Sequence, residues 1–133
     1  MSESIPAKAK DHTYSLAKKA AFAAVGKKAS DVIILSLREL TSVADFFVLC
    51  TGDVDLHVKA IADAVKKALK HDLKPWHIEG YQHSHWVLID FVDFVVHVFQ
   101  KETRDYYNIE RLWADAPLEK IDQMDDPSRE QNN

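Results

Sequence analysis

Two aspartates separated by one residue, Asp53 and Asp55, follow Gly52 where an apolar segment gives way to a helical pattern. Carboxylates at this spacing can hold Mg²⁺ for nucleotidyl transfer. Such a centre normally needs a third carboxylate and a phosphate-binding turn upstream, and the best-placed further acids, Asp90 and Asp93, belong to a different predicted turn. Asp55 is also typical of a helix cap. The sequence favours the cap and leaves a metal-dependent nucleotidyltransferase as an alternative.

Seven histidines raise the question of a metal site, and several fall on or beside predicted strands: His77, His83, His85 and His97. Zinc bound by histidine needs converging side chains whose orientation is fixed by outer hydrogen-bond partners, and this spacing specifies neither. We therefore expect no metal and no cofactor. Cys50 is the single cysteine and lies in an apolar segment, so we expect no intrachain disulfide and a buried, unreactive thiol.

Large aromatic residues are concentrated in the second half of the chain: Trp76, Tyr81, Trp86, Tyr107 and Trp113. Tyrosine and tryptophan side chains that remain exposed are frequent anchors of protein interfaces. The alternation along residues 86–90 places Trp86, Leu88 and Asp90 on one face of a strand. Because that face ends in an acid, we expect Trp86 to be partly exposed.

The chain has 133 residues, a mass of 15.2 kDa, 47% apolar residues and 29% charged residues, which is typical of one globular domain. Its formal charge of −4 argues against a protein that works by neutralising phosphates, so we expect no direct sequence-specific nucleic-acid binding. No apolar run approaches the ~20 residues of a membrane span, and the polar N-terminal segment lacks the apolar region of a signal peptide. We expect a cytoplasmic protein that does not enter a membrane.

The elements that must position these residues follow from the spacing of apolar side chains. Helical patterns cover residues 13–25, 55–70 and 104–114, and strand patterns cover residues 31–37, 46–51, 76–79, 85–90 and 94–100. The order αββαβββα predicts an α/β fold with a single mixed β-sheet and packed helices, because a helix between strands permits a parallel crossover and the 85–100 hairpin is antiparallel. Residues 1–12 are expected to be a flexible lead and residues 115–133 an acidic, disordered tail, which leaves a domain at 13–114.

Several segments, taken together in this order and spacing, match one known family. They are Thr41–Gly52 (TSVADFFVLCTG), His57–Asp63 (HVKAIAD), Glu79–Gly80, Trp86–Asp90 (WVLID), Val95–Phe99 (VVHVF) and Arg104–Trp113 (RDYYNIERLW). On these segments, which span about residues 13–114, the sequence resembles the ribosomal silencing factor family, also called RsfS or Iojap-like. The HVKAIAD helix together with the VVHVF hairpin strand carries most of the resemblance.

The resemblance implies a nucleotidyltransferase-like fold without the transferase chemistry, and therefore no enzyme. It implies binding to the large ribosomal subunit through ribosomal protein L-fourteen, at the face that meets the small subunit, so that subunit joining is sterically blocked and translation falls when nutrients are limiting. It also implies a homodimer, and a role in assembly of the large subunit is a further alternative. A small acidic domain bearing aromatic residues suits a basic ribosomal protein better than RNA.

Transfer of the family's motif positions to this chain gives seven candidate partner-binding residues: Trp86, Leu88, Asp90, His97, Phe99, Arg104 and Tyr107. For each of them, packing in the core is the competing interpretation. The chain departs from the family pattern at Val54, Leu56 and Val92. Val92 stands where relatives usually have the glycine of the hairpin turn, and glycine is the residue that adopts positive φ at little cost.

Overall fold

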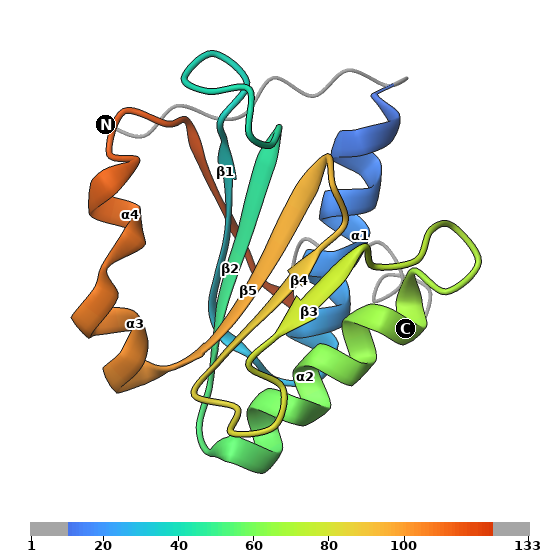
Figure 1. The fold of residues 1–133 in the computed structure, drawn as a ribbon, viewed down its shortest axis with the longest axis vertical. Coiled ribbons are helices and arrows are strands. Elements are labelled where there is room, and N and C mark those ends of the chain that lie inside the picture. Colours follow the sequence, from blue (N-terminus) through green and yellow to red (C-terminus); the bar gives the residue numbers. More distant parts are fainter. Residues whose placement is uncertain (1–10, 124–133) are drawn as a thin grey trace.

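The computed structural model describes residues 11–123, which form one six-stranded sheet with helices on both of its faces (Figure 1). The strand order is β3-β4-β5-β2-β1-β6. The strands are β1 (Ser30–Ser36), β2 (Phe46–Gly52), β3 (His77–Glu79), β4 (Trp86–Asp90), β5 (Phe94–Gln100) and β6 (Leu118–Ile121). The predicted α/β class with a single mixed sheet is confirmed.

Two parallel strands, β2 and β5, lie at the centre of the sheet. Their register runs from Phe46 opposite Phe94 to Gly52 opposite Gln100. Both strands are apolar along nearly their whole length, because both of their faces are covered. The two strands therefore begin together beside the β4–β5 turn and end together beside the starts of α2 and α3.

Helices α1 (His12–Gly26) and α2 (Asp55–Ala68) cover one face of the sheet, and α3 (Lys101–Tyr107) and α4 (Ile109–Leu112) stand against the other (Figure 1). The main core lies beneath α1 and α2, where α1 packs closely through four alanines without exposed surface: Ala17, Ala20, Ala21 and Ala24. A smaller core lies beneath α3 and α4 and includes Ile33, Leu35, Leu49, Phe99 and Ile109. Within residues 11–123, none of the helices has the length and apolar character needed to cross a membrane.

The C-terminal segment differs from the prediction, because residues 118–121 form strand β6 rather than part of a disordered tail. β6 pairs antiparallel with β1, and its Ile121 is buried in the main core. Glu119 accepts hydrogen bonds from the Tyr14 hydroxyl (2.6 Å) and the Lys18 ammonium (3.1 Å) of α1. The sequence did not reveal β6 because four residues in an acidic segment are too few to show an apolar periodicity. The side-chain hydrogen bonds that hold β6 are made to α1, near the other end of the chain. The sheet therefore continues past residue 114, while residues 124–133 of the predicted tail lie outside the described residues.

Of the predicted flexible lead, residues 1–12, the structure describes only Asp11 and His12. α1 already begins at His12, and Asp11 caps it by accepting a hydrogen bond from the Tyr14 backbone N–H at 3.1 Å. Residues 1–10 of the predicted lead lie outside the described part of the structure.

The last predicted helix, residues 104–114, is two helices rather than one. α3 runs from Lys101 to Tyr107 and is followed by its C-cap Asn108, whose φ of 45° is left-handed. Asparagine tolerates this conformation better than most residues and often ends a helix in this way. The chain turns at Asn108 and continues as α4 in a new direction. The predicted element order αββαβββα is therefore wrong at its C-terminal end, where the structure has two helices and a further strand.

Candidate partner-binding site

An aromatic network crosses the face of the sheet that carries α3 and α4. Its rings, which follow one another at centroid distances between 4.6 and 6.1 Å, are Trp113, Phe47, His97, Trp86, Tyr107 and Tyr106. The network starts after α4, passes over strands β2, β5 and β4, and ends on α3. We call the α3–α4 segment, residues 101–113, the arm. The network joins the arm to the sheet at the end of α3 and at Trp113, the residue after α4.

The outer rings of this network, together with Leu88 of β4 and Leu112 of α4, are what we call the aromatic surface: Phe47, Trp86, Leu88, Tyr106, Tyr107, Leu112 and Trp113. The arm contributes the most exposed members, since Tyr106 is 81% exposed, Leu112 76% and Tyr107 52%. The members on the sheet are half-buried. Exposed apolar groups gathered in one place, rather than scattered singly, mark a surface that binds a partner.

His97 holds Trp86 at the edge of the aromatic surface. The indole Nε1–H donates to His97 Nδ1 at 3.1 Å, and the indole ring stacks on Phe99 at 4.9 Å. Because an indole N–H can only donate, Nδ1 carries no proton and the neutral imidazole has its proton on Nε2, which is buried without a hydrogen-bond partner among the described residues. His97 is 4% exposed, and burial lowers its pKa to about 3. The ring therefore stays neutral and keeps accepting from Trp86.

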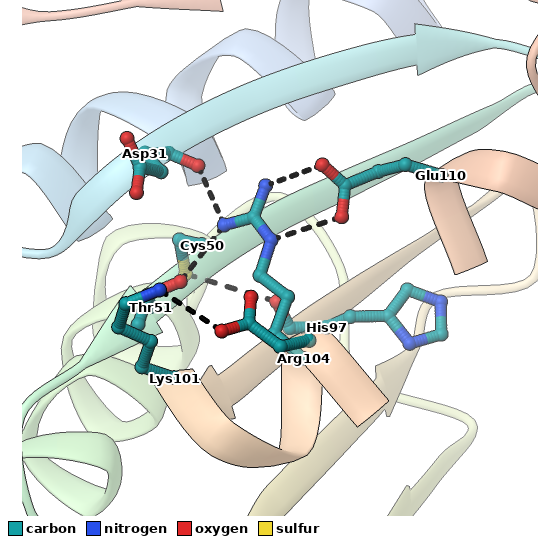
Figure 2. A network of polar contacts seen from close by, with 8 residues as sticks. Asp31, Cys50, Thr51, His97, Lys101, Arg104 and Glu110 are labelled. Carbon is teal, nitrogen blue, oxygen red and sulfur yellow. Dashed lines mark hydrogen bonds and ion pairs between the residues drawn. The ribbon is translucent and has the colours of Figure 1, made fainter. Parts of the chain in front are cut away.

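Arg104 of α3 ties the arm to the sheet (Figure 2). Its guanidinium donates to both carboxylate oxygens of Glu110 in α4, at 3.0 and 3.1 Å. It also donates to the Asp31 backbone carbonyl at 2.7 Å and to the Thr51 hydroxyl at 2.8 Å. The planar fork of arginine suits such a two-oxygen contact. One buried cation thus connects α3, α4, β1 and β2, and the turn at Asn108 is what brings Glu110 back over it.

Four of the seven predicted partner-binding residues reach the surface. Tyr107 is exposed, and Trp86, Leu88 and Asp90 are half-buried on one face of β4. Asp90 also has a structural role, because its Oδ1 accepts a hydrogen bond from the Val92 backbone N–H at 2.7 Å in the hairpin turn. The structure therefore agrees with the expectation that Trp86 is partly exposed.

The other three predicted residues are buried. Phe99 has no exposed surface, His97 is 4% exposed and Arg104 is 8% exposed. Each of them supports a residue of the aromatic surface or the arm. Their side chains can influence a partner only through the neighbours that they hold.

Among residues 11–123, no further acids gather around Asp53 and Asp55 to form a metal-binding group. Asp55 is the first residue of α2 rather than its cap, so the predicted cap is wrong, and its carboxylate accepts a hydrogen bond from the Gln100 side-chain amide. The Asp53 side chain is 86% exposed. Asp90 and Asp93 lie beside the start of β5, whereas Asp53 follows the end of β2, so the parallel pairing of these strands keeps the two pairs of acids apart.

The candidate histidines are also dispersed. The rings of His83 and His85 lie 5.2 Å apart, whereas His77 pairs with Glu79 at 3.2 Å. In the described part of the chain, no three or more His, Cys, Asp or Glu side chains are grouped so that they could hold a metal ion. Cys50 is buried, and burial raises the pKa of its thiol to about 12, so the thiol remains protonated.

Several contributors to the site do not stand out in the sequence. Phe47 lies in an apolar run that predicts burial on both faces, and it is half-buried because the short arm covers only part of the sheet. The positions of Tyr106, Glu110 and Leu112 depend on the break between α3 and α4. Asn108 was the one signal of this break, as a residue type that often ends helices.

Comparison with known proteins assigns the chain to a family. The family model described as "Ribosomal silencing factor during starvation" matches residues 10–133. The chain belongs to the RsfS family. The ribosomal silencing factor RsfS of Bacillus subtilis is 43% identical to this RsfS-family chain over 109 residues, which are 81% of this chain and 92% of the relative.

More distant relatives and solved structures agree with this assignment. A crystal structure of a protein from Chromobacterium violaceum matches with a TM-score of 0.74 and 38% identity, covering 76% of this chain and 85% of that one. The mouse protein named "Mitochondrial assembly of ribosomal large subunit protein 1" is 32% identical over 93 residues, which are 66% of this RsfS-family chain and 40% of the mouse protein. The resemblance found in the sequence is confirmed.

Proposed function

We propose that this RsfS-family protein is a non-enzymatic repressor of translation, which docks on the large ribosomal subunit through ribosomal protein L-fourteen. Docking there sterically blocks the small subunit and lowers translation in the cytoplasm when nutrients are limiting. Family membership supports the ribosomal partner. The observation that carries the proposal is the aromatic surface, whose most exposed members stand on an arm fixed to the sheet by Arg104.

The proposed contact combines exposed anchors with buried supports. Residues that reach the partner are Trp86, Leu88, Asp90, Tyr107 and Leu112. Trp86 is held by His97 and Phe99, and the arm that carries Tyr107 and Leu112 is held by Arg104. A few large aromatic side chains of this kind usually carry most of the free energy of an interface.

The charge around the aromatic surface suits a basic partner. Residues 75–113, which include β3, β4, β5 and the arm, contain six acids against three lysine and arginine residues. Ribosomal proteins bind RNA phosphates, which favours a basic surface. Opposite charges accelerate encounter and disfavour wrong partners.

Leu112 and Leu56 provide a matched test, since they are 76% and 77% exposed. They belong to α4 and α2, helices that lie on opposite sides of the sheet (Figure 1). Leu112→Ala should weaken binding to purified L-fourteen by roughly tenfold, or ~1.4 kcal/mol. Leu56→Ala should leave this affinity unchanged. Calorimetric titration measures both, and circular dichroism checks that both variants fold. Equal losses of affinity would contradict the placement of the contact.

Subunit joining tests the function itself. Added to separated subunits before they are mixed, the protein should keep them apart in a sucrose gradient, whereas added to joined ribosomes it should do much less. Leu112→Ala should require roughly tenfold more protein for the same effect. Normal binding to the large subunit with undiminished joining would sink the occlusion mechanism.

Assembly of the large subunit is a second candidate function, which the name of the mouse relative favours. An assembly factor would bind incomplete large subunits, and its depletion would make them accumulate even in rich medium. A factor that only occludes would leave assembly normal under the same conditions. Sedimentation of pulse-labelled subunits from depleted cells distinguishes the two.

A further inference from the structure

The side of the molecule opposite the aromatic surface carries the opposite charge. Residues 12–28 and 55–74, which contain α1, α2 and the turns that follow them, hold nine lysines and three aspartates. The whole chain nevertheless has a formal charge of −4, so the other residues hold a large excess of acids. The lysines are therefore concentrated in the segments that contain α1 and α2, while acids predominate in the rest of the chain.

Five lysines follow one face of α2 and the turns after it: Lys59, Lys66, Lys67, Lys70 and Lys74. Helical spacing keeps Lys59, Lys66 and Lys67 away from the buried residues of α2, and Lys70 and Lys74 follow in the segment after the helix. Lys67, Lys70 and Lys74 are exposed, and none of these three forms an ion pair with another described residue. We call these five residues the lysine row.

An aromatic ring and one acid are built into the lysine row. The Lys59 and Lys66 ammonium groups lie 5.5 and 5.0 Å from the centroid of the Tyr81 ring. Asp63, the acid within the row, accepts hydrogen bonds from the Tyr81 hydroxyl at 3.0 and 3.1 Å and pairs with Lys66 at 3.5 Å. Its charge is thus partly neutralised inside the row, which leaves Lys67, Lys70 and Lys74 unopposed.

A hollow of about 500 Å³ adjoins the ring, lined by Lys66, Ile78, Gly80, Tyr81, Gln82 and His83. Its lining offers an ammonium, an amide, an imidazole and a phenol as hydrogen-bonding groups. Cations in a row beside an aromatic ring form the arrangement that tracks a nucleic-acid backbone and accepts an unstacked base.

We propose that the lysine row, with Tyr81 beside it, binds the phosphate backbone of RNA without regard to base sequence. Five ammonium groups strung along α2 and the turns after it, with one acid among them, suit a string of phosphates better than the scattered carboxylates of a protein surface. The inference goes beyond the proposed function, because docking on a ribosomal protein uses the opposite side of the sheet. A single molecule can therefore contact a protein through its aromatic surface and ribosomal RNA through α2.

The test measures the anisotropy of a fluorescein-labelled RNA hairpin of arbitrary sequence with the full chain over a series of KCl concentrations. Binding should weaken as salt rises, and the triple variant Lys67→Gln, Lys70→Gln, Lys74→Gln should lower the slope of log K against log salt by about 2. A control that removes three exposed cations elsewhere should keep the slope: Lys101→Gln, Arg111→Gln, Lys120→Gln. Equal loss in both variants, or no salt-dependent binding by the unmodified chain, would overturn the proposal.

Asp63→Asn gives the reverse test, because a folding defect cannot produce tighter binding. Loss of this acid should strengthen binding of the RNA hairpin severalfold, and unchanged or weaker binding would contradict the proposal. Polyglutamate and the RNA hairpin can also be compared at the same concentration of negative charges. Stronger binding of polyglutamate would identify a face that binds acidic proteins and would overturn the proposal. The lysine variants should keep their affinity for L-fourteen, so failure of this inference and failure of the proposed function give different results.

Discussion

Val92 occupies a backbone conformation that its side chain disfavours. Its φ is 75°, in the left-handed region, and it is 58% exposed, so little packing compensates for the β-branched side chain. The resemblance to the family led us to expect a glycine at this position of the hairpin turn. The structure shows the positive φ that such a glycine would adopt freely.

Val92→Gly should therefore raise the free energy of unfolding by about 1 kcal/mol. Relief of a strain of ~1–3 kcal/mol outweighs the extra backbone entropy of glycine in the unfolded chain, which costs ~0.5–1 kcal/mol. Urea denaturation measures the change. Val92→Ala is the control, because it keeps a Cβ at positive φ and should gain less. Lower stability of the glycine variant would show that Val92 makes packing contacts that offset its strain.

His97 links stability to pH. Burial holds its pKa at about 3 in the folded protein, below the ordinary 6.5. Below pH 6.5 the unfolded chain binds a proton that the folded protein excludes, so His97 lowers stability progressively from pH 6.5 down to about 3, with a limiting slope of ~1.4 kcal/mol per pH unit. Above pH 6.5 this contribution does not change with pH.

His97→Gln should flatten this part of the stability curve, since glutamine does not titrate and can still accept from the Trp86 indole. Urea denaturation of both proteins across the window gives the comparison, in which carboxyl groups contribute equally and cancel. Parallel curves for the two proteins would show that His97 is not the titrating group.

At the scale of elements, the sequence predicts what apolar periodicity determines. β5 was predicted at its observed bounds, 94–100, and β2 within one residue, because continuous apolar runs mark strands covered on both faces. β6 was missed because it is fixed by distant partners, since Glu119 bonds to α1. The break at Asn108 was missed because it rests on one left-handed residue and on the polar pair of Arg104 and Glu110, neither of which alters the apolar pattern.

The candidate site was predictable to the same degree. The alternation along β4 identified Trp86 and Leu88 as one face of a strand, and both reach the aromatic surface. Spacing could not show that Phe99 is fully buried. Alternation tells which face of the strand a residue is on, but not whether another element covers that face. Which part of a sheet face stays open is decided by the length and direction of the arm.

Truncation tests the strand that the sequence did not reveal. The free energy of unfolding of a chain that ends at Pro117 should be ~3 kcal/mol lower than that of a chain that ends at Gln123. It loses the buried Ile121 and the hydrogen bonds of Glu119 to α1, which contribute ~1.5–3 and ~1–3 kcal/mol. Thermal melting followed by circular dichroism measures the difference. Equal melting temperatures for the two chains would show that β6 adds nothing to the fold.

At the scale of the whole molecule, one sheet separates two surfaces of different character. The aromatic surface lies on the side of α3 and α4, and the lysine row lies on the side of α1 and α2 (Figure 1). Because both face the solvent from opposite sides of one packed sheet, occupation of one leaves the other accessible. The fold thus allows a protein contact and an RNA contact at the same time.

The aromatic surface also bears on oligomeric state. Exposure of apolar side chains such as Tyr106 and Leu112 to water is unfavourable. A symmetric homodimer would remove them from water by covering them with the same surface of a second copy. If the homodimer and the complex with L-fourteen bury this one surface, the two exclude each other, and the ribosome-bound form is the monomer. Sedimentation velocity should then show a monomer–dimer equilibrium that Leu112→Ala shifts toward monomer. Added L-fourteen should convert the dimer into a complex with one copy of each chain, and a complex that retains two copies of this chain would place the dimer contact on a different surface.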